Sequence, residues 1–383
     1  MFISNREKPT FVDFDENALA TTFYTSGTTG LPKQVCFSHR QLVLHTLALG
    51  AALGGRKGLG LRAGDVYMPL TPMFHVHAWG MPYLATMLGL RQIYPGRYEV
   101  DAILRWREAE GVTFSHGVPT VLQMVLGGAE RLGIRLDGWQ MLLGGSALTR
   151  DLADAARATG MTIAAGYGMS ETGPVISIGE ESADPYSTIR SGKPIPLVSA
   201  AIVDEEMKAL PCDDAASGEL VVRAPWLTPC YPGDEPASRD LWRGGWLHTQ
   251  DIASIDEAGS IQIRDRLKDV IKSGGEWISS LMLEELIIRH PDVAEVAVVG
   301  VSDAKWQERP VAIVVATRDG VPTHEAINAL LARFVEEGAI SRFALLDDVM
   351  LVDALPRTGV GKIDKKLLRQ ALEAKSKPCS RNA

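Results

Sequence analysis

Apolar residues recur along the chain at two spacings, and each spacing predicts a different element. Residues 139–143 and 161–165 are short apolar runs that end in glycine-rich turns, as buried strands do. Between Thr323 and Gly338 the apolar residues instead recur every three or four positions, which predicts a helix with one buried face. That face carries Ile327, Leu330, Leu331, Phe334 and Val335.

A helix is also predicted between the two apolar runs. Thr149 suits its N-cap, Asp151 its first turn, and Gly160 its end. A strand, a helix and a strand in alternation predict an α/β fold, in which functional groups gather at the ends of strands.

The pattern changes twice towards the C-terminus. Strands at 200–203 and 219–223 flank polar turns, which indicates a small β-rich subdomain. Strands rich in Val and Ala follow at 293–301 and 311–316. We therefore expect a large α/β domain over residues 1–264, which includes the β-rich subdomain, and a small, mobile α+β domain over residues 265–383.

Composition narrows the function classes. The chain has 383 residues, of which 46% are hydrophobic, and a formal net charge of −8, which argues against a general nucleic-acid binder. The most apolar stretch, residues 78–90, is shorter than the roughly 20 residues that a membrane span needs. The first ten residues have no apolar run of the kind found in signal peptides, so we expect no signal peptide and a cytoplasmic protein. Scattered cysteines without a metal-binding spacing predict free thiols, at Cys36, Cys212, Cys230 and Cys379.

The first segment whose residue types suit ligand binding is residues 24–33, YTSGTTGLPK. Its glycines let backbone N–H groups approach phosphate oxygens, its hydroxyls add hydrogen-bond donors, and Lys33 adds a positive charge. No Ser or Thr follows the lysine, so the segment is not a Walker loop. By composition alone, an ordinary surface turn is an equal alternative.

This segment resembles the phosphate loop of the adenylate-forming superfamily, which includes acyl-CoA synthetases, luciferases and peptide-synthetase adenylation domains. Six further segments resemble the family's other motifs in the family's order. They are residues 74–79 (FHVHAW), 167–172 (YGMSET), 245–251 (GWLHTQD), 264–269 (RDRLKD), 272–278 (KSGGEWI) and 356–362 (PRTGVGK). The likeness is strongest to the medium- and long-chain fatty acyl-CoA synthetases.

The resemblance implies a role for each matching residue. It implies catalysis by Lys33, His75, Glu171 and Lys362, with Thr29 and Glu171 as Mg²⁺ ligands. It implies ATP or coenzyme A contacts at Thr25, Ser26, Gly27, Thr28, Thr29, Gly30, Gly145, Gly166, Tyr167, Gly168, Met169, Ser170, Thr172, Asp251, Arg266, Lys272, Gly274, Gly275, Glu276 and Trp277. It places Trp79 and Gly144 at the acyl pocket and makes Asp265 the hinge of a rotating C-terminal domain.

Without the resemblance, each of these side chains has a simpler interpretation. Glu171 is then a solvated carboxylate, Tyr167 a half-buried strand-end ring, and Asp251 a turn residue. His75 and His77 lie on one face if their segment is extended, which would suit two metal ligands, but no third ligand cluster accompanies them.

The expected activity is two-step. A carboxylic acid and ATP form acyl-AMP and pyrophosphate, and coenzyme A then takes the acyl group. Medium- or long-chain fatty acids are the expected substrates, with short thioether or aryl acids as the alternative. The sequence leaves both a monomer and a homodimer open.

Two departures from the family support a rival hypothesis. Only 23 residues precede Tyr24, where family members carry a sizeable N-terminal region, and Gln250 stands where the family normally has glycine. The rival is a non-catalytic nucleotide-binding fragment or pseudoenzyme. The glutamine would matter if the position needs a positive φ or open space, and it would be neutral if the side chain points outward.

Overall fold

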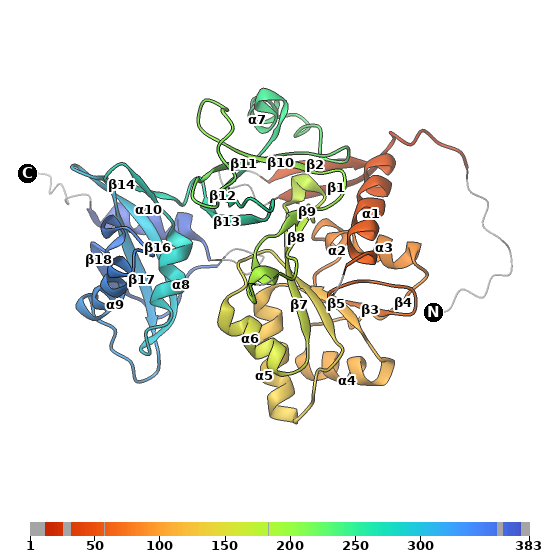
Figure 1. Cartoon of the computed structure of the whole chain (residues 1–383), viewed down its shortest axis with the longest axis horizontal. Helices are drawn as coiled ribbons and strands as arrows, with labels where there is room; N and C mark the ends of the chain where they lie inside the picture. The colour runs from red at the N-terminus through yellow and green to blue at the C-terminus, as the bar shows by residue number, and fades with distance from the viewer. Residues whose placement is uncertain (1–11, 26–31, 57, 183, 358–362, 377–383) are drawn as a thin grey trace, which may run out of the picture. The chain divides into compact units, whose positions relative to one another are not determined.

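The structure, a computed structural model, describes residues 12–25, 32–56, 58–182, 184–357 and 363–376 (Figure 1). The chain divides into two compact units. The first comprises residues 1–200 and 222–248, and the second comprises residues 201–221 and 249–383. Residues 249–264 thus pack with the second unit. The domain boundary at 264/265 stays a prediction.

The first unit follows the expected alternation of strands and helices. Its strands are β1 (Leu19–Thr25), β2 (Lys33–Ser38), β3 (Val66–Pro69), β4 (Arg91–Gln92), β5 (Phe114–Gly117), β6 (Gln140–Leu143), β7 (Thr162–Tyr167), β8 (Ser177–Ile178) and β9 (Lys193–Pro194). Its helices are α1 (His39–Gly54), α2 (Val76–Trp79), α3 (Met81–Met87), α4 (Val100–Glu110), α5 (Pro119–Leu132), α6 (Arg150–Ala158) and α7 (Glu235–Leu241). Short 3₁₀ turns are η1 (Ser170–Thr172), η2 (Ser187–Ile189) and η3 (Arg243–Gly245).

A seven-stranded sheet in the order β4-β3-β5-β6-β7-β8-β9 organises this unit. Strands β3 to β7 run parallel, and β8 and β9 continue the sheet antiparallel. Helices α4, α5 and α6 connect the parallel strands, as parallel pairing requires (Figure 1). All carboxyl ends of the parallel strands therefore meet at one edge, and the expected α/β fold is confirmed.

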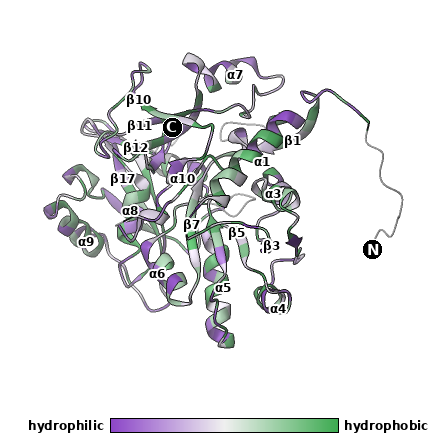
Figure 2. Ribbon diagram, turned by 45° about the vertical axis from the view of Figure 1, so that its right-hand side comes forward, coloured by the Kyte–Doolittle hydropathy of each residue, from purple (hydrophilic) through white to green (hydrophobic). Residues whose placement is uncertain are grey.

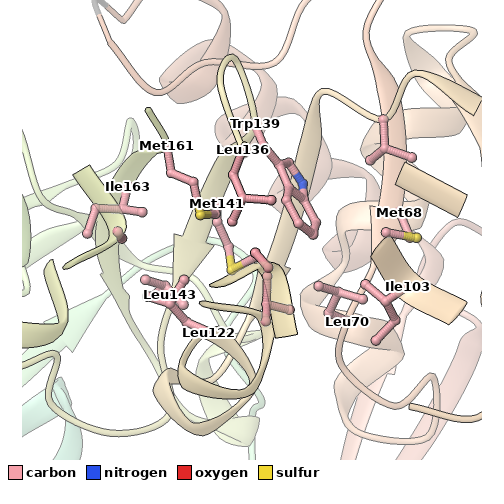
Figure 3. Close-up of a cluster of buried hydrophobic side chains, with 14 of the residues drawn as sticks. Met68, Leu70, Ile103, Leu122, Leu136, Trp139, Met141, Leu143, Met161 and Ile163 are labelled. Carbon is pink, nitrogen blue, oxygen red and sulfur yellow. The ribbon is translucent and has the colours of Figure 1, made fainter. Parts of the chain in front are cut away.

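Local sequence signals account for much of this unit. The Thr149 hydroxyl accepts a hydrogen bond from the amide of Leu152 and so caps α6, as predicted. Helix α5 carries both hydrophobic and hydrophilic residues (Figure 2), and its apolar residues enter the core. Figure 3 shows this core, where Trp139 and Met141 from the β6 region lie among Leu122 of α5 and residues of neighbouring strands.

The second unit contains two sheets. Its elements include most of β10 (Ser199–Val203), β11 (Gly218–Arg223) and β12 (Leu247–Ile255), at which the two units join along the chain. The other strands are β13 (Ile261–Arg266), β14 (Ile271–Ser273), β15 (Glu276–Ile278), β16 (Val293–Asp303), β17 (Gln307–Ala316) and β18 (Asp348–Leu351). The helices are α8 (Ser280–Ile287), α9 (His324–Glu336) and α10 (Lys365–Ser376), with a 3₁₀ turn η4 (Arg342–Ala344).

One sheet has the order β10-β11-β12-β13, which is the predicted β-rich part. In the other, β15-β14-β17-β16 with β18 beside β17, helices cover both faces. Val296 and Val298 of β16 join a core with α8 and α9, while Ala297 and Val299 face Leu368 of α10. This alternation follows from the two-residue period of a strand.

No helix within the described residues is both long and apolar enough to span a bilayer. The thiols of Cys36, Cys212 and Cys230 are free, and Cys379 lies outside the described residues.

Candidate active site

The predicted phosphate loop joins two antiparallel strands. Thr25, the last residue of β1, pairs with Lys33, the first residue of β2. The segment 26–31 between them, which carries the predicted residues Ser26, Gly27, Thr28, Thr29 and Gly30, lies outside the described residues, as does Lys362. The hairpin register nevertheless fixes both ends of the loop. Strand β2 then leads directly into α1, whose N-cap is Ser38.

Lys33 and Glu171 are brought together by Tyr231, which was not predicted from the sequence. The ammonium of Lys33 lies 4.5 Å from the ring centroid of Tyr231, a cation–π contact. The hydroxyl of Tyr231 donates a 2.7 Å hydrogen bond to Oε1 of Glu171, whose exposed fraction is only 6%. Burial, reinforced by the Glu171 carboxylate, raises the pKa of Tyr231 well above its usual range, so the ring keeps its proton.

The segment that carries Tyr231 is tied to the surrounding elements by polar contacts. The indole N–H of Trp226 donates to the carbonyl of Thr172 at 2.9 Å. The Thr228 hydroxyl donates to the carbonyl of Cys36 in β2, and its amide donates to the carbonyl of Glu171. These bonds hold β2, η1 and Tyr231 in one framework.

The predicted adenine motif lies at the end of β7, where the parallel part of the sheet stops. Gly166 and Tyr167 are its last residues, and η1 follows with Ser170, Glu171 and Thr172. A β-carbon on Gly168 would lie 1.1 Å from the carbonyl oxygen of Pro174, so this position has no room for a side chain. The tight return of the chain therefore explains this glycine.

The segment with His75 and His77 is not extended. Val76, His77, Ala78 and Trp79 have φ angles of 47°, 50°, 47° and 60°, which makes α2 a single left-handed turn. The two histidines were expected to share a face only if this segment is extended, and it is not. β-Carbon crowding costs about 1–2 kcal/mol for each such residue, so tertiary contacts must hold the turn in place.

The turn delivers Trp79 to the carboxyl end of the sheet. A β-carbon on Gly144, directly after β6, would come within 3.1 Å of Cη2 of Trp79 and 2.8 Å of the Gly166 carbonyl oxygen. Trp79 and Gly144, the two residues predicted at the acyl pocket, therefore lie in contact distance of one another. The neighbouring Gly145 has a φ of 81°, which favours glycine.

A buried histidine lies beneath Trp79. The ring of His116, at the end of β5, lies 5.1 Å from that of Trp79. Its Nδ1 and Nε2 are hydrogen-bonded to the hydroxyls of Tyr67 and Thr71, at 3.2 and 2.5 Å. Burial lowers the pKa of His116 to about 3, so the ring is neutral and both nitrogens are satisfied.

In the second unit, Asp251 and Arg266 are direct partners across β12 and β13, and their side chains form a 3.7 Å ion pair. Gln250, which precedes Asp251, has a φ of 58° and an exposed side chain. The backbone N–H of Gln250 donates to Oε1 of Glu219, and its backbone carbonyl accepts from the backbone N–H of Leu267. The positive φ is one of the two reasons expected for a family glycine at this position.

The predicted thioester segment is a tight hairpin. Lys272 pairs with Trp277 and Ser273 with Glu276, which leaves Gly274 and Gly275 as the turn. Their φ angles of 62° and 82° are those of a two-residue turn that glycine favours. The ammonium of Lys272 lies 5.3 Å from the half-exposed ring of Trp277.

Asp265, the predicted hinge, is 1% exposed and firmly bonded. Its Oδ2 accepts hydrogen bonds from the amide and the hydroxyl of Ser280, the first residue of α8. The ammonium of Lys365 in turn donates to the Ser280 hydroxyl and pairs with Glu284, both at 2.7 Å. Burial raises the pKa of Asp265 and that of Glu284.

Glu171 fits the implied Mg²⁺. This ion commonly takes one or two carboxylates together with substrate phosphates, and Glu171 is a single carboxylate in the same framework as the phosphate-loop lysine. Within the described ranges no three His, Cys, Asp or Glu side chains cluster as metal ligands, so an all-protein metal cage is not formed there.

Three residues of this site were not predicted from the sequence: Tyr231, Trp226 and His116. Tyr231 follows Pro229-Cys230 in a loop without a helical or strand pattern, and only its contacts identify it. His116 lies one residue before the end of β5, and a polar residue near the carboxyl end of a parallel strand was the one available signal.

Comparison with known proteins places this arrangement among known enzymes. A family model described as AMP-binding enzyme matches residues 3–232, and one described as AMP-binding enzyme C-terminal domain matches residues 282–362. The long-chain-fatty-acid–CoA ligase of Thermus thermophilus is 42% identical over 368 residues, which are 93% of this chain and 66% of that protein. The 3-methylmercaptopropionyl-CoA ligase of Ruegeria lacuscaerulensis is 38% identical, with the same coverage.

The fold is also similar to that of solved structures. The ATP-bound structure of MatB from Rhodopseudomonas palustris superposes with a TM-score of 0.81 at 27% identity, over 96% of this chain and 70% of that one. The chain spans about two thirds of the length of the curated relatives it matches.

Proposed function

Since the chain belongs to the AMP-binding enzyme family, we propose that it is an ATP-dependent, AMP-forming acid–CoA ligase. In the first step a carboxylate oxygen attacks the α-phosphorus of ATP, which forms acyl-AMP and releases pyrophosphate. In the second step the thiol of coenzyme A attacks the acyl carbonyl, which forms acyl-CoA and releases AMP and the thiol proton.

The observation that carries this proposal is the group formed by Lys33, Tyr231 and Glu171. A lysine at the end of the phosphate-loop hairpin and a buried carboxylate share one neutral aromatic ring. This group supplies a positive charge for phosphate oxygens and an oriented acidic ligand, which are the needs of a nucleotide bound with a divalent ion.

The chemistry of the first step suits cationic groups better than a general base. A carboxylic acid with a pKa near 4 is already ionised at pH 7, so the enzyme need not remove a proton. The obstacle is charge at the α-phosphate, which preorganised cations and amide donors stabilise. Mg²⁺ held by Glu171, and by Thr29 from the phosphate loop, would neutralise phosphate charge. Lys33 and Lys362 contribute the protein's own cations.

The other predicted residues receive roles in this scheme. Tyr167 and its flanking glycines contact adenine, and the Asp251 carboxylate accepts hydrogen bonds from the ribose hydroxyls with Arg266 beside it. His75, Trp79 and Gly144 serve the acyl group. Asp265 is the hinge about which residues 265–383 rotate between the steps, and residues 272–277 then serve thioester formation.

We propose a medium- or long-chain fatty acid as the acyl substrate. The resemblance of residues 268–280 to fatty acyl-CoA synthetases and the 42% identity to a long-chain ligase support this choice. The 38% identity to a 3-methylmercaptopropionyl-CoA ligase favours a short thioether acid as the second candidate.

The test is nucleotide release by the purified full chain with ATP, Mg²⁺, coenzyme A and one acid at a time. The acids are short, medium and long straight-chain acids, 3-methylmercaptopropionate and 2-succinylbenzoate. We expect AMP and pyrophosphate, with the highest kcat/KM for a medium- or long-chain acid. ADP release would contradict the proposed chemistry, and a preference for the thioether acid would contradict the proposed acyl class.

Acid-dependent exchange of labelled pyrophosphate into ATP separates the enzyme from a nucleotide-binding pseudoenzyme. An enzyme that forms acyl-AMP reversibly catalyses this exchange without coenzyme A. Nucleotide binding without exchange for any acid would support the pseudoenzyme instead.

A further inference from the structure

The left-handed turn at Val76–Trp79 is the feature from which this inference starts. Elsewhere in the described ranges, non-glycine residues with positive φ occur singly, whereas here four follow one another without a glycine. Gly80 continues the positive φ into the start of α3. Because this conformation is unfavourable for L-residues, specific contacts must compensate for it.

His77 makes those contacts on two sides. Its Nε2 is hydrogen-bonded at 2.9 Å to the hydroxyl of Thr21 in β1. Its Nδ1 is hydrogen-bonded at 2.9 Å to the hydroxyl of Tyr83 in α3. The ring of Phe23 meets the imidazole edge-on, with centroids 4.5 Å apart. Since hydroxyls both donate and accept, either neutral tautomer of His77 satisfies both partners.

The turn in turn sets the position of Trp79, two residues further on. Trp79 is 5% exposed and lies between the ring of His116 and the backbone at Gly144. A β-carbon on Gly144 would already come within 3.1 Å of this indole, so a shift of the turn has little room to be absorbed on that side. A side chain that fixes the turn therefore fixes the indole.

We propose that His77 is a positioning residue for the acyl subsite: it clamps the left-handed turn between β1 and α3 and so holds Trp79 in place. His77 acts through Trp79 and touches no reacting atom. The inference rests on the proposed function for the role of Trp79 as part of the acyl pocket. Its structural half, the control of Trp79 by His77, stands on the contacts alone.

Two substitutions of His77 separate the contribution of its aromatic ring from that of its two hydrogen bonds. His77→Phe keeps an aromatic ring against Phe23 and removes both hydrogen bonds. His77→Asn removes the ring and the reach to both hydroxyls, but asparagine tolerates a left-handed backbone well. If the two hydrogen bonds are what matters, both variants disturb Trp79, and Thr21→Val and Tyr83→Phe each reproduce part of the effect.

The position of Trp79 can be read without turnover by fluorine NMR of the full chain labelled with 5-fluorotryptophan. The chain has eight tryptophans, and the resonance that disappears in Trp79→Phe is that of Trp79. We expect this resonance to shift or broaden in both His77 variants. Tyr94→Phe, which removes an exposed tyrosine hydrogen bond to Gln92, is the matched control and should leave it unchanged.

The kinetic readout is the KM for the acid compared with the KM for ATP. Loss of two hydrogen bonds predicts a rise of about tenfold in the KM for the acid. The KM for ATP should stay within about twofold, because the Lys33–Tyr231–Glu171 group is untouched. A purely structural defect would instead lower the active fraction, and hence kcat, without this split.

Two results would overturn the inference. One is a Trp79 resonance that is the same in wild type, His77→Phe and His77→Asn. The other is a KM for ATP that rises as much as the KM for the acid. A chain that releases no AMP with any acid would overturn the proposed function, while the fluorine spectra would still decide whether His77 holds Trp79.

Discussion

The hydroxyl of Tyr231 donates a 2.7 Å hydrogen bond to Oε1 of Glu171, although 60 positions separate the two residues in the chain. This bond orients the carboxylate that we assign to Mg²⁺, and the same ring carries the ammonium of Lys33 on its face. Tyr231 thus connects the phosphate-loop lysine with the acidic ligand.

Tyr231→Phe should weaken the use of ATP while it keeps the ring under Lys33. The variant leaves a buried carboxylate oxygen without this donor, which costs about 1–3 kcal/mol. We expect the KM for Mg-ATP to rise about tenfold, with little change in acyl preference. Tyr186→Phe, which removes an exposed tyrosine–carboxylate bond to Asp154, is the matched control. An unchanged KM for Mg-ATP in Tyr231→Phe would remove this residue from the site.

Substitution of Asp265 should separate the two half-reactions. The restriction of φ and the loss of the carboxylate have to be tested by different variants. Proline fixes φ near −65° and restricts rotation, but it also removes the carboxylate that accepts from Ser280. Asp265→Asn removes the charge without fixing φ. We expect Asp265→Pro to lower conversion of supplied acyl-AMP to acyl-CoA much more than pyrophosphate exchange, and Asp265→Asn to lower both to similar extents.

Lys362→Ala should show the opposite selectivity to Asp265→Pro. We expect a loss of about 10² or more in acyl-AMP formation, as for a transition-state donor, while supplied acyl-AMP still gives acyl-CoA. The same selectivity in Lys362→Ala and Asp265→Pro would refute the assignment of Asp265 as a hinge between the steps.

Gln250→Gly should stabilise the second unit, because φ is 58° at this position. Removing the β-carbon relieves about 1–2 kcal/mol, of which the added freedom of glycine in the unfolded chain cancels up to about 1 kcal/mol. We therefore expect a net gain of up to about 1 kcal/mol in urea unfolding, and a lower KM for ATP because Asp251 is adjacent. Gln250→Ala keeps the β-carbon and should give neither effect. Equal effects of Gln250→Gly and Gln250→Ala on unfolding and on the KM for ATP would mean that the side-chain amide of Gln250 is responsible, and not the positive φ.

The buried carboxylate of Glu284 should make stability depend on pH. Burial raises its pKa above the ordinary 4.5, so the folded state holds this proton at a pH where the unfolded state has lost it. Stability from this group is therefore greatest below about pH 4.5 and declines as the pH rises towards the folded pKa. Glu284→Gln should reduce this decline, as measured by urea unfolding at a series of pH values, while Asp265, whose pKa burial also raises, keeps its own part of it. Glu295→Gln, at a half-exposed glutamate of β16, should leave it intact.

Several elements could be predicted because their signals are local. The N-cap of α6 at Thr149 and the acidic residue Asp151 in its first turn each depend on a few neighbouring residues. The period of apolar residues likewise predicted α9, and Ile327 and Leu331 of the expected face are buried. These features are present in the folded structure because tertiary packing favours the same local conformation as the sequence does.

The sequence by itself determined the family, the order of the motifs and the chemical type of each candidate side chain. Only the tertiary structure decided that Tyr231 meets Glu171, that Lys365 and Ser280 hold Asp265, and that residues 76–79 turn left-handed. The first two depend on residues far apart in the chain, for which no local period or cap exists. The left-handed turn runs against local preference, so it exists only because contacts with β1 and α3 outweigh its backbone cost.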